Sequence, residues 1–315
     1  MTGAPLYADV ADAPDGGQAF FVAAKDGTRI RFALWQGGAC GLAVVFPGRT
    51  ECLEKYGRMA GKLVARGFSV VVIDWRGQGL SDRLHNSTAV GHVDDFADYQ
   101  QDVDAMLTHP AVASIAGPRL LFAHSMGGCI GLRSLLSRSD FSAAVFSAPM
   151  WGLNLPNAQQ YLAPMLARFG VFLGRGRKAL PAQPKGFYLT REPFEDNNLT
   201  HDQNYWNYMR DQIVKYPALA LGPPSHMWLK QAFSEMAALE VVQKPELPVL
   251  AFLGGDESIV SSAAIRRMMA HFPNGELLEI TGARHEIWME TPEIQAQCWA
   301  ETDAFLKKNL KGQAV

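Results

Sequence analysis

The sequence has few cysteines, little net charge and no signal-like N-terminus. Its four cysteines lack Cys-x-x-Cys spacing, so neither a zinc knuckle nor a disulfide framework is expected, and a reduced, cytoplasmic compartment fits best. The formal net charge of -2 offers no basic surface for nucleic acid. Residues 1–20 have no basic patch followed by an apolar run, which is unlike a secretory signal and predicts a loosely ordered lead-in.

The longest uncharged stretch, Phe141–Ala167, is not a membrane-spanning helix. It is interrupted by Pro149, Pro156 and Pro164 and contains four Asn and Gln residues. A spanning helix needs about 20 predominantly apolar residues. The composition is compatible with peripheral contact at the inner face of a membrane, and it leaves the oligomeric state open.

Short runs of Val, Ile, Phe and Leu alternate with longer segments of helical spacing, which is typical of a mainly parallel α/β sheet flanked by helices. We predict eight strands, of which the first two form an antiparallel pair. The predicted strands are Phe20–Ala24, Arg29–Trp35, Leu42–Phe46, Phe68–Asp74, Arg119–Ala123, Ala143–Ser147, Val249–Gly254 and Leu277–Thr281. The predicted helices are Glu54–Arg66, Asp94–Leu107, Gly127–Leu136, Ala263–His271 and Pro292–Lys308.

The alternation stops between residues 151 and 245, which are rich in Pro, Asn, Trp and Tyr. We predict that residues 1–150 and 246–315 form one core and that residues 151–245 form a helical cap inserted after the sixth strand. The apolar runs Tyr161–Leu166 and Phe169–Leu173 are candidates for the wall of an acyl-chain site. The alternative is that they only pack the cap onto the core.

A serine directly follows one of the predicted strands. Residues 120–128 read LLFAHSMGG, so a buried strand ends, Ser125 follows, and glycines open a helix. A nucleophile elbow of the form G-x-S-x-G needs small residues beside the serine because the turn is strained. Ala123 occupies the first small position and is still compact. We predict that Ser125 is a nucleophile; the alternative is that it only caps the following helix.

Enzymes with such an elbow take their partners in the order Ser, acid, His. His285 stands in a loop after the last predicted strand, where this order requires the base, and an imidazole can accept and return the serine proton. Asp256 and Glu257 compete for the acid position after the strand Val249–Gly254. We predict Glu257, with Asp256 as the alternative.

An oxyanion hole needs two N–H donors. We predict the backbone of Met126 as one and that of Arg49, in the Pro-Gly-Arg loop after the strand Leu42–Phe46, as the other. The Arg49 guanidinium would then lie at the mouth of the site and favour a phosphate head group. The alternative is a surface arginine paired with Glu51 or Glu54.

These motifs resemble those of bacterial lysophospholipases of the L2 type, relatives of monoacylglycerol lipases and of the wider serine aminopeptidase hydrolases. The resemblance covers roughly residues 20–310. It rests on Ala-His-Ser-Met-Gly-Gly at 123–128, Asp-Trp-Arg-Gly-Gln-Gly-Leu-Ser at 74–81, the segment 48–56, Asn-Leu-Thr-His-Asp at 198–202 and Gly-Ala-Arg-His-Glu at 282–286. It implies an α/β-hydrolase fold and, from the family pattern around Gly254 and Val260, Glu257 as the acid. The departures are Pro47 in place of His and Ala123 in place of Gly.

The resemblance implies hydrolysis of a lipid-like carboxylic ester, such as a lysophospholipid or a monoacylglycerol, without cofactor or metal. The alternatives are a short-chain carboxylesterase, an iminopeptidase-like amidase and a non-catalytic binding module on the same fold. The run at 74–81 lacks the Lys-Ser/Thr ending of a phosphate loop, and we predict a structural turn beside the site.

Overall fold

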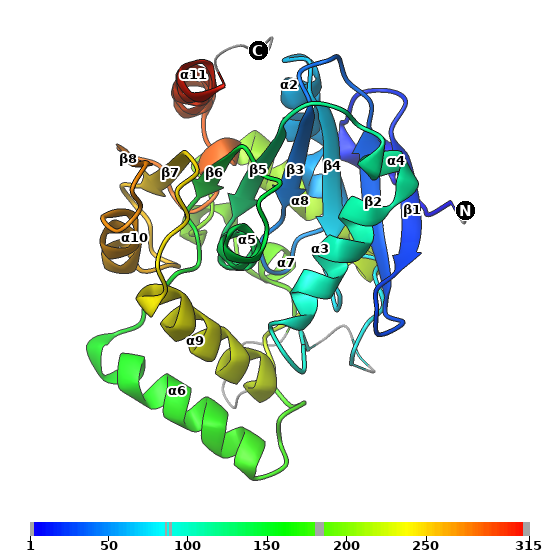
Figure 1. Ribbon diagram of the computed structural model, residues 1–315. Coiled ribbons are helices and arrows are strands. Elements are labelled where there is room, and N and C mark those ends of the chain that lie inside the picture. Colours follow the sequence, from blue (N-terminus) through cyan, green and yellow to red (C-terminus); the bar gives the residue numbers. More distant parts are fainter. Residues whose placement is uncertain (1–2, 86, 88–89, 180–185, 311–315) are drawn as a thin grey trace.

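The computed structural model describes residues 3–85, 87, 90–179 and 186–310. Its centre is an eight-stranded sheet in the order β1-β2-β4-β3-β5-β6-β7-β8 (Figure 1). β2 runs antiparallel to its neighbours β1 and β4, and all other neighbouring pairs are parallel. The strands are β1 (Gln18–Ala23), β2 (Arg29–Trp35), β3 (Leu42–Phe46), β4 (Ser69–Asp74), β5 (Arg119–His124), β6 (Ala143–Ser147), β7 (Val249–Gly254) and β8 (Gly275–Ile280).

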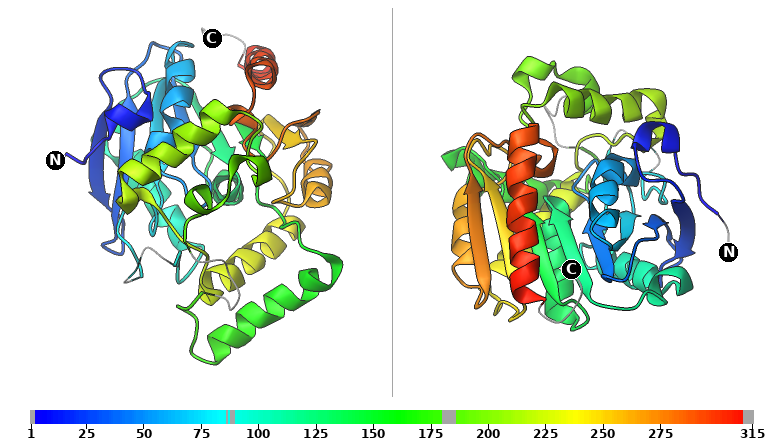
Figure 2. Two further views of the ribbon diagram at one scale, coloured as in Figure 1. Left: turned by 180° about the vertical axis from the view of Figure 1, so that it is seen from behind. Right: turned by 90° about the horizontal axis from the view of Figure 1, so that it is seen from above.

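The central strands are mostly apolar because helices cover both faces of the sheet. Every residue of β3, β5 beyond Arg119, β6 and β7 is buried. α2 (Gly57–Val64) and α11 (Pro292–Asn309) lie on one face, and α3 (Asp98–Thr108) and α5 (Met126–Ser137) lie on the other (Figure 2). α4 (Pro110–Ala113) follows α3, and α10 (Ser262–Met269) packs on β7 and β8. This is the predicted α/β architecture.

The named elements between β6 and β7, within the described residues, are all helical. They are α6 (Asn157–Phe172), α7 (Tyr188–Arg191), η2 (Phe194–Asp196), α8 (Gln203–Lys215), η3 (Pro217–Leu219) and α9 (His226–Val241). We call this group the cap. α6 is the outermost helix, and α9 lies between it and the rest of the molecule (Figure 1). The division of the chain at residues 150 and 245 stays a prediction.

The N-terminal lead-in differs from the prediction. Instead of being loosely ordered, it forms α1 (Ala8–Ala11) and is hydrogen-bonded to the cap. The Tyr208 hydroxyl donates to the Ala11 carbonyl at 2.7 Å, and Gln212 Nε2 donates to the Val10 carbonyl at 3.0 Å. This order could not be predicted from the local sequence, because the hydrogen-bond partners lie about 200 positions away along the chain. The predicted helix from residue 54 is also divided, into η1 (Leu53–Tyr56) and α2.

No helix within the described residues is both long and apolar enough to cross a membrane.

Candidate active site

Ser125 lies in a strained turn between β5 and α5. Its backbone has φ 50° and ψ -118°, a conformation that a non-glycine residue rarely adopts and that marks functional turns. The glycines after it are sterically required: a Cβ on Gly127 would come within 2.1 Å of the Phe46 carbonyl oxygen, and one on Gly128 within 2.6 Å of Pro149. The serine side chain makes no capping hydrogen bond to α5, which removes the helix-cap alternative.

Glu257 and His285 come from the loops after β7 and β8 and form a hydrogen-bonded pair. His285 Nδ1 lies 2.7 Å from Glu257 Oε2 and donates to it, because an ionised carboxylate only accepts. The other oxygen, Oε1, accepts from the backbone N–H groups of Ile259 (2.6 Å) and Val260 (3.0 Å). Burial alone would raise the pKa of Glu257, but the bond and charge of His285 and these N–H groups lower it below its usual value.

The competing acid, Asp256, does not reach His285. Its side chain is 57% exposed and lies 4.0 Å from Nε2 of His201 instead. The structure therefore brings Glu257, and not its neighbour, to the imidazole. With Nδ1 donating to Glu257, Nε2 is the ring nitrogen left to accept a proton.

Ser125 and His285 line the same cavity, which has a volume of about 340 Å³. Both follow strands of the parallel sheet, whose carboxyl ends meet at one edge. The cavity wall is largely apolar, and much of it comes from the cap: Phe187, Leu189, Leu199, Met209, Ile213, Leu221, Trp228 and Leu229.

The apolar runs Tyr161–Leu166 and Phe169–Leu173 are not part of this wall, so the structure does not support the acyl-site role predicted for them. They lie on α6, which packs against α9 on the side away from the sheet (Figure 1). Within the described cap, the cavity-facing apolar residues come from α7, α8 and α9 and from the segments that flank them.

The loop that carries Arg49 lies directly against the nucleophile turn. Met126 is the first residue of α5, where helix geometry leaves the N–H without an intrahelical partner. Among the described residues, no hydrogen bond uses the N–H of Arg49. The two predicted oxyanion donors are therefore at adjacent turns and both available.

The structural turn at residues 74–81 holds this loop in place. Trp75 Nε1 donates to the Pro47 carbonyl at 2.8 Å, Gln78 Nε2 donates to that of Gly48 at 3.0 Å, and the N–H of Thr50 donates back to Gln78 Oε1 at 3.2 Å. The sequence predicted the turn but not that its side chains position the loop after β3.

Comparison with known proteins identifies the family. A model of the family described as serine aminopeptidase, S33, matches residues 37–292. The chain belongs to the serine aminopeptidase S33 family. The relatives show the α/β-hydrolase fold and place the chain among the ester hydrolases of that fold, as the resemblance implied.

Among the relatives of this hydrolase, lysophospholipase L2 of Escherichia coli strain K12 is 31% identical over 275 residues, which cover 81% of this chain and 77% of that protein. A soluble variant of the monoglyceride lipase of Saccharomyces cerevisiae has the same fold, with a TM-score of 0.71 at 21% identity, over 91% of this chain and 94% of that one. A carboxyl esterase of Bacillus coagulans matches with a TM-score of 0.69 at 15% identity, over 96% of this chain and all of that one.

The Arg49 side chain of the hydrolase lines the cavity and forms no ion pair with any carboxylate among the described residues. One guanidinium nitrogen donates to the Gly222 carbonyl at 2.6 Å, and the group lies 5.0 Å from the ring centre of Trp228. Burial lowers its pKa to about 10. The alternative of a surface ion pair is wrong: Glu51 binds Lys55 and Glu54 binds Arg31.

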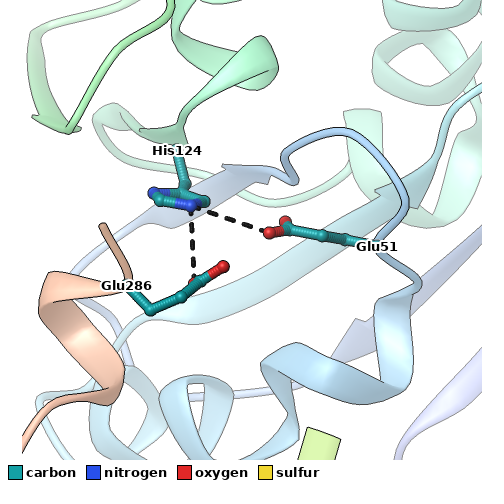
Figure 3. Close-up of side chains that lie close together, drawn as sticks. All are labelled: Glu51, His124 and Glu286. Atoms are coloured by element: carbon teal, nitrogen blue, oxygen red, sulfur yellow. Dashed lines mark ion pairs between the residues drawn. The ribbon is translucent and has the colours of Figure 1, made fainter. Parts of the chain in front are cut away.

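A buried charged network lies beside Ser125 and His285, and its members Glu51, Lys55 and Glu286 also line the cavity. Sequence reasoning missed it. Lys55 Nζ lies 2.6 Å from Glu51 Oε1 and 2.6 Å from Glu286 Oε1. His124 Nε2 faces the same two carboxylates, at 3.6 and 3.4 Å (Figure 3). The Tyr56 hydroxyl and the N–H of Gly48 also donate to Glu51, so the network is joined to the oxyanion loop.

The two carboxylates and His124 are close enough to hold a metal ion. The Lys55 ammonium already supplies a cation between Glu51 and Glu286, so the charge balance is met by protein groups. Burial would lower the pKa of His124, but the carboxylates of Glu286 and Glu51 raise it above its usual value. The His124 ring lies 4.7 Å, centre to centre, from the ring of His285.

Proposed function

We propose that this hydrolase cleaves carboxylic esters of lipid-like substrates through an acyl-enzyme on Ser125. The observation that carries the proposal is the Glu257–His285 pair in the same cavity as a serine held in a strained elbow. His285 Nε2 takes the serine proton as Oγ attacks the ester carbonyl, and returns it to the departing alcohol. Water then attacks the acyl-enzyme, with His285 again as base.

In this mechanism the N–H groups of Met126 and Arg49 stabilise the oxyanion of each tetrahedral intermediate. Glu257 holds the imidazole in the tautomer that leaves Nε2 free, and stabilises the imidazolium once it forms. The lowered pKa of Glu257 supports this role, because the carboxylate stays ionised throughout the cycle. The step needs no group beyond the chain, the ester and water.

The substrate that fits best is a lysophospholipid. The apolar cap wall suits an acyl chain, whose burial contributes about 0.8 kcal/mol per methylene. Arg49 adds a half-buried cation that forms no ion pair with a described carboxylate, and a phosphate head group would supply the missing charge. A monoacylglycerol would leave it uncompensated. The four free thiols are consistent with a cytoplasmic enzyme.

The test compares purified wild-type protein with Arg49→Met and Arg49→Lys on lysophosphatidylcholine and on a monoacylglycerol of the same chain length. A charge-assisted hydrogen bond contributes about 1.5–3 kcal/mol, so we expect kcat/KM for the lysophospholipid to fall roughly ten- to hundredfold more than for the monoacylglycerol in Arg49→Met. Arg49→Lys should retain part of the preference for the lysophospholipid over the monoacylglycerol. Equal losses on both substrates would leave Arg49 with a structural role only.

The reaction class is tested separately. A fluorophosphonate probe should label the wild-type protein and not Ser125→Ala. A non-catalytic binding module would not be labelled in either form. Short-chain esters and an aminoacyl amide, assayed beside the lysolipid, distinguish a carboxylesterase or an amidase from a lysophospholipase by their relative kcat/KM.

A further inference from the structure

The outer face of α6 exposes a continuous stripe of large apolar side chains. Of the nine large apolar residues that are exposed in the described part of the chain, seven lie here, and Phe172 is 84% exposed. Their spacing places them along one side of the helix. We call this set the α6 face: Tyr161, Leu162, Met165, Leu166, Phe169, Phe172 and Leu173.

The opposite side of α6 is made of small residues and packs on α9. Ala167 is fully buried, and a Cβ on Gly170 would come within 2.1 Å of His226 Nδ1. The usual amphipathic pattern, with large apolar residues toward the protein, is therefore inverted. Packing within the described part of the chain does not explain the α6 face, because its side chains are exposed. α6 itself is the outermost helix of the cap (Figures 1 and 2).

Positive charge accompanies this apolar surface. No Asp or Glu occurs between Phe141 and Arg191. Four exposed cations stand on or just after α6: Arg168, Arg175, Arg177 and Lys178. Arg177 is partly compensated by Asp94, at 3.7 Å.

We propose that the α6 face docks on an anionic membrane surface, with its apolar side chains among the acyl chains and these cations at the lipid phosphates. An amphipathic helix of this kind lies in the plane of the interface, held by buried apolar area and by attraction to anionic lipids. A second copy of the chain is a poorer occupant, because a two-fold contact would place the same cations against each other. α9, which packs on α6, carries Trp228 and Leu229 into the cavity, so docking brings the substrate site to the bilayer.

The test is sedimentation of the full chain with vesicles of phosphatidylcholine alone and of phosphatidylcholine mixed with phosphatidylglycerol. We expect the wild-type protein to bind the mixed vesicles. In Leu166→Glu/Phe172→Glu the partition coefficient should fall by about tenfold or more, since two inserted side chains become charged. In Arg168→Glu/Arg175→Glu the dependence on phosphatidylglycerol should disappear.

The matched control is Val214→Glu/Val241→Glu, which places the same charges at two exposed apolar residues outside the α6 face. It should bind vesicles as the wild type does. Every variant should hydrolyse a soluble short-chain ester at the wild-type rate, which shows that its fold is intact. The vesicle-binding measurement is also repeated with Ser125→Ala, so that its result does not depend on the proposed reaction.

The proposal would be overturned if Leu166→Glu/Phe172→Glu bound the vesicles as strongly as the wild type does. It would also be overturned if Val214→Glu/Val241→Glu lost as much vesicle binding as that variant. A protein that sediments as a dimer, and that this variant converts to a monomer with unchanged vesicle binding, would show that the α6 face joins two copies. Absence of wild-type binding to either vesicle would also contradict the proposal.

Discussion

The core of this hydrolase buries charge, whereas its cap exposes apolar surface. Beside the site, Lys55 and His124 are enclosed with two carboxylates, and Lys55 pairs with both of them. On the cap, the α6 face turns large apolar side chains toward solvent. The contrast matches the two proposals: the core holds fixed charges beside the proposed active site, and the cap exposes the surface that we propose docks on a membrane.

The strongest test of the core is removal of the reacting groups. Ser125→Ala and His285→Ala should each reduce kcat by on the order of a million-fold, because triad members act as a unit. Both variants should unfold at nearly the wild-type temperature. Ester turnover and thermal melts on the same preparations check this, and residual activity of several per cent in Ser125→Ala would exclude the acyl-enzyme.

The next test separates the two adjacent carboxylates. Glu257→Gln should lower kcat by on the order of ten-thousand-fold, because the pair with His285 is lost. Asp256→Asn is the matched control and should stay near wild type, since Asp256 is exposed and does not contact His285. The reverse order of effects would return the acid role to Asp256.

Breaking the buried network should cost stability. Lys55→Met leaves Glu51 and Glu286 facing each other without their cation, and removal of one partner from a buried pair costs about 3–5 kcal/mol. Lys308→Met removes a lysine that is 66% exposed and paired with Glu276, and it should cost about 1 kcal/mol or less. Urea unfolding curves measure both; equal costs would mean that the network is not what stabilises this region.

The smallest expected effect is a pH dependence from His124. Its pKa is raised in the folded protein, so its protonated ring stabilises the fold below the usual value of 6.5, and this contribution is lost as the pH rises through the raised pKa. His124→Gln should therefore flatten the decline in the free energy of unfolding as the pH rises above 6.5. Parallel curves for the two proteins would show that His124 does not titrate there.

The candidate site was largely predictable because its residues follow individual strands. Ser125 is marked by its local glycines, His285 by its place after the last strand, and Glu257 by its spacing from Gly254 and Val260. Each signal lies within a few residues of the group it identifies. Four of the eight strands also match their predicted bounds: β2, β3, β6 and β7.

The buried network and the direction of α6 were not predictable in this way. Glu51, Lys55, His124 and Glu286 come from segments up to 235 positions apart, and none of them looks unusual alone. The sequence of α6 is apolar on two sides, and only its packing on α9 decides that the small residues face inward. Both features depend on contacts between distant segments.

The order of the N-terminal segment has a consequence for the cavity. Tyr7 stacks on Tyr216 at 3.7 Å, and Ala11 and Val10 accept hydrogen bonds from Tyr208 and Gln212 of α8. The same helix carries Met209 and Ile213 into the cavity wall. Residues 3–12 thus support the helix that forms one side of the cavity, although none of them lines it. We therefore expect their removal to alter the cavity from a distance.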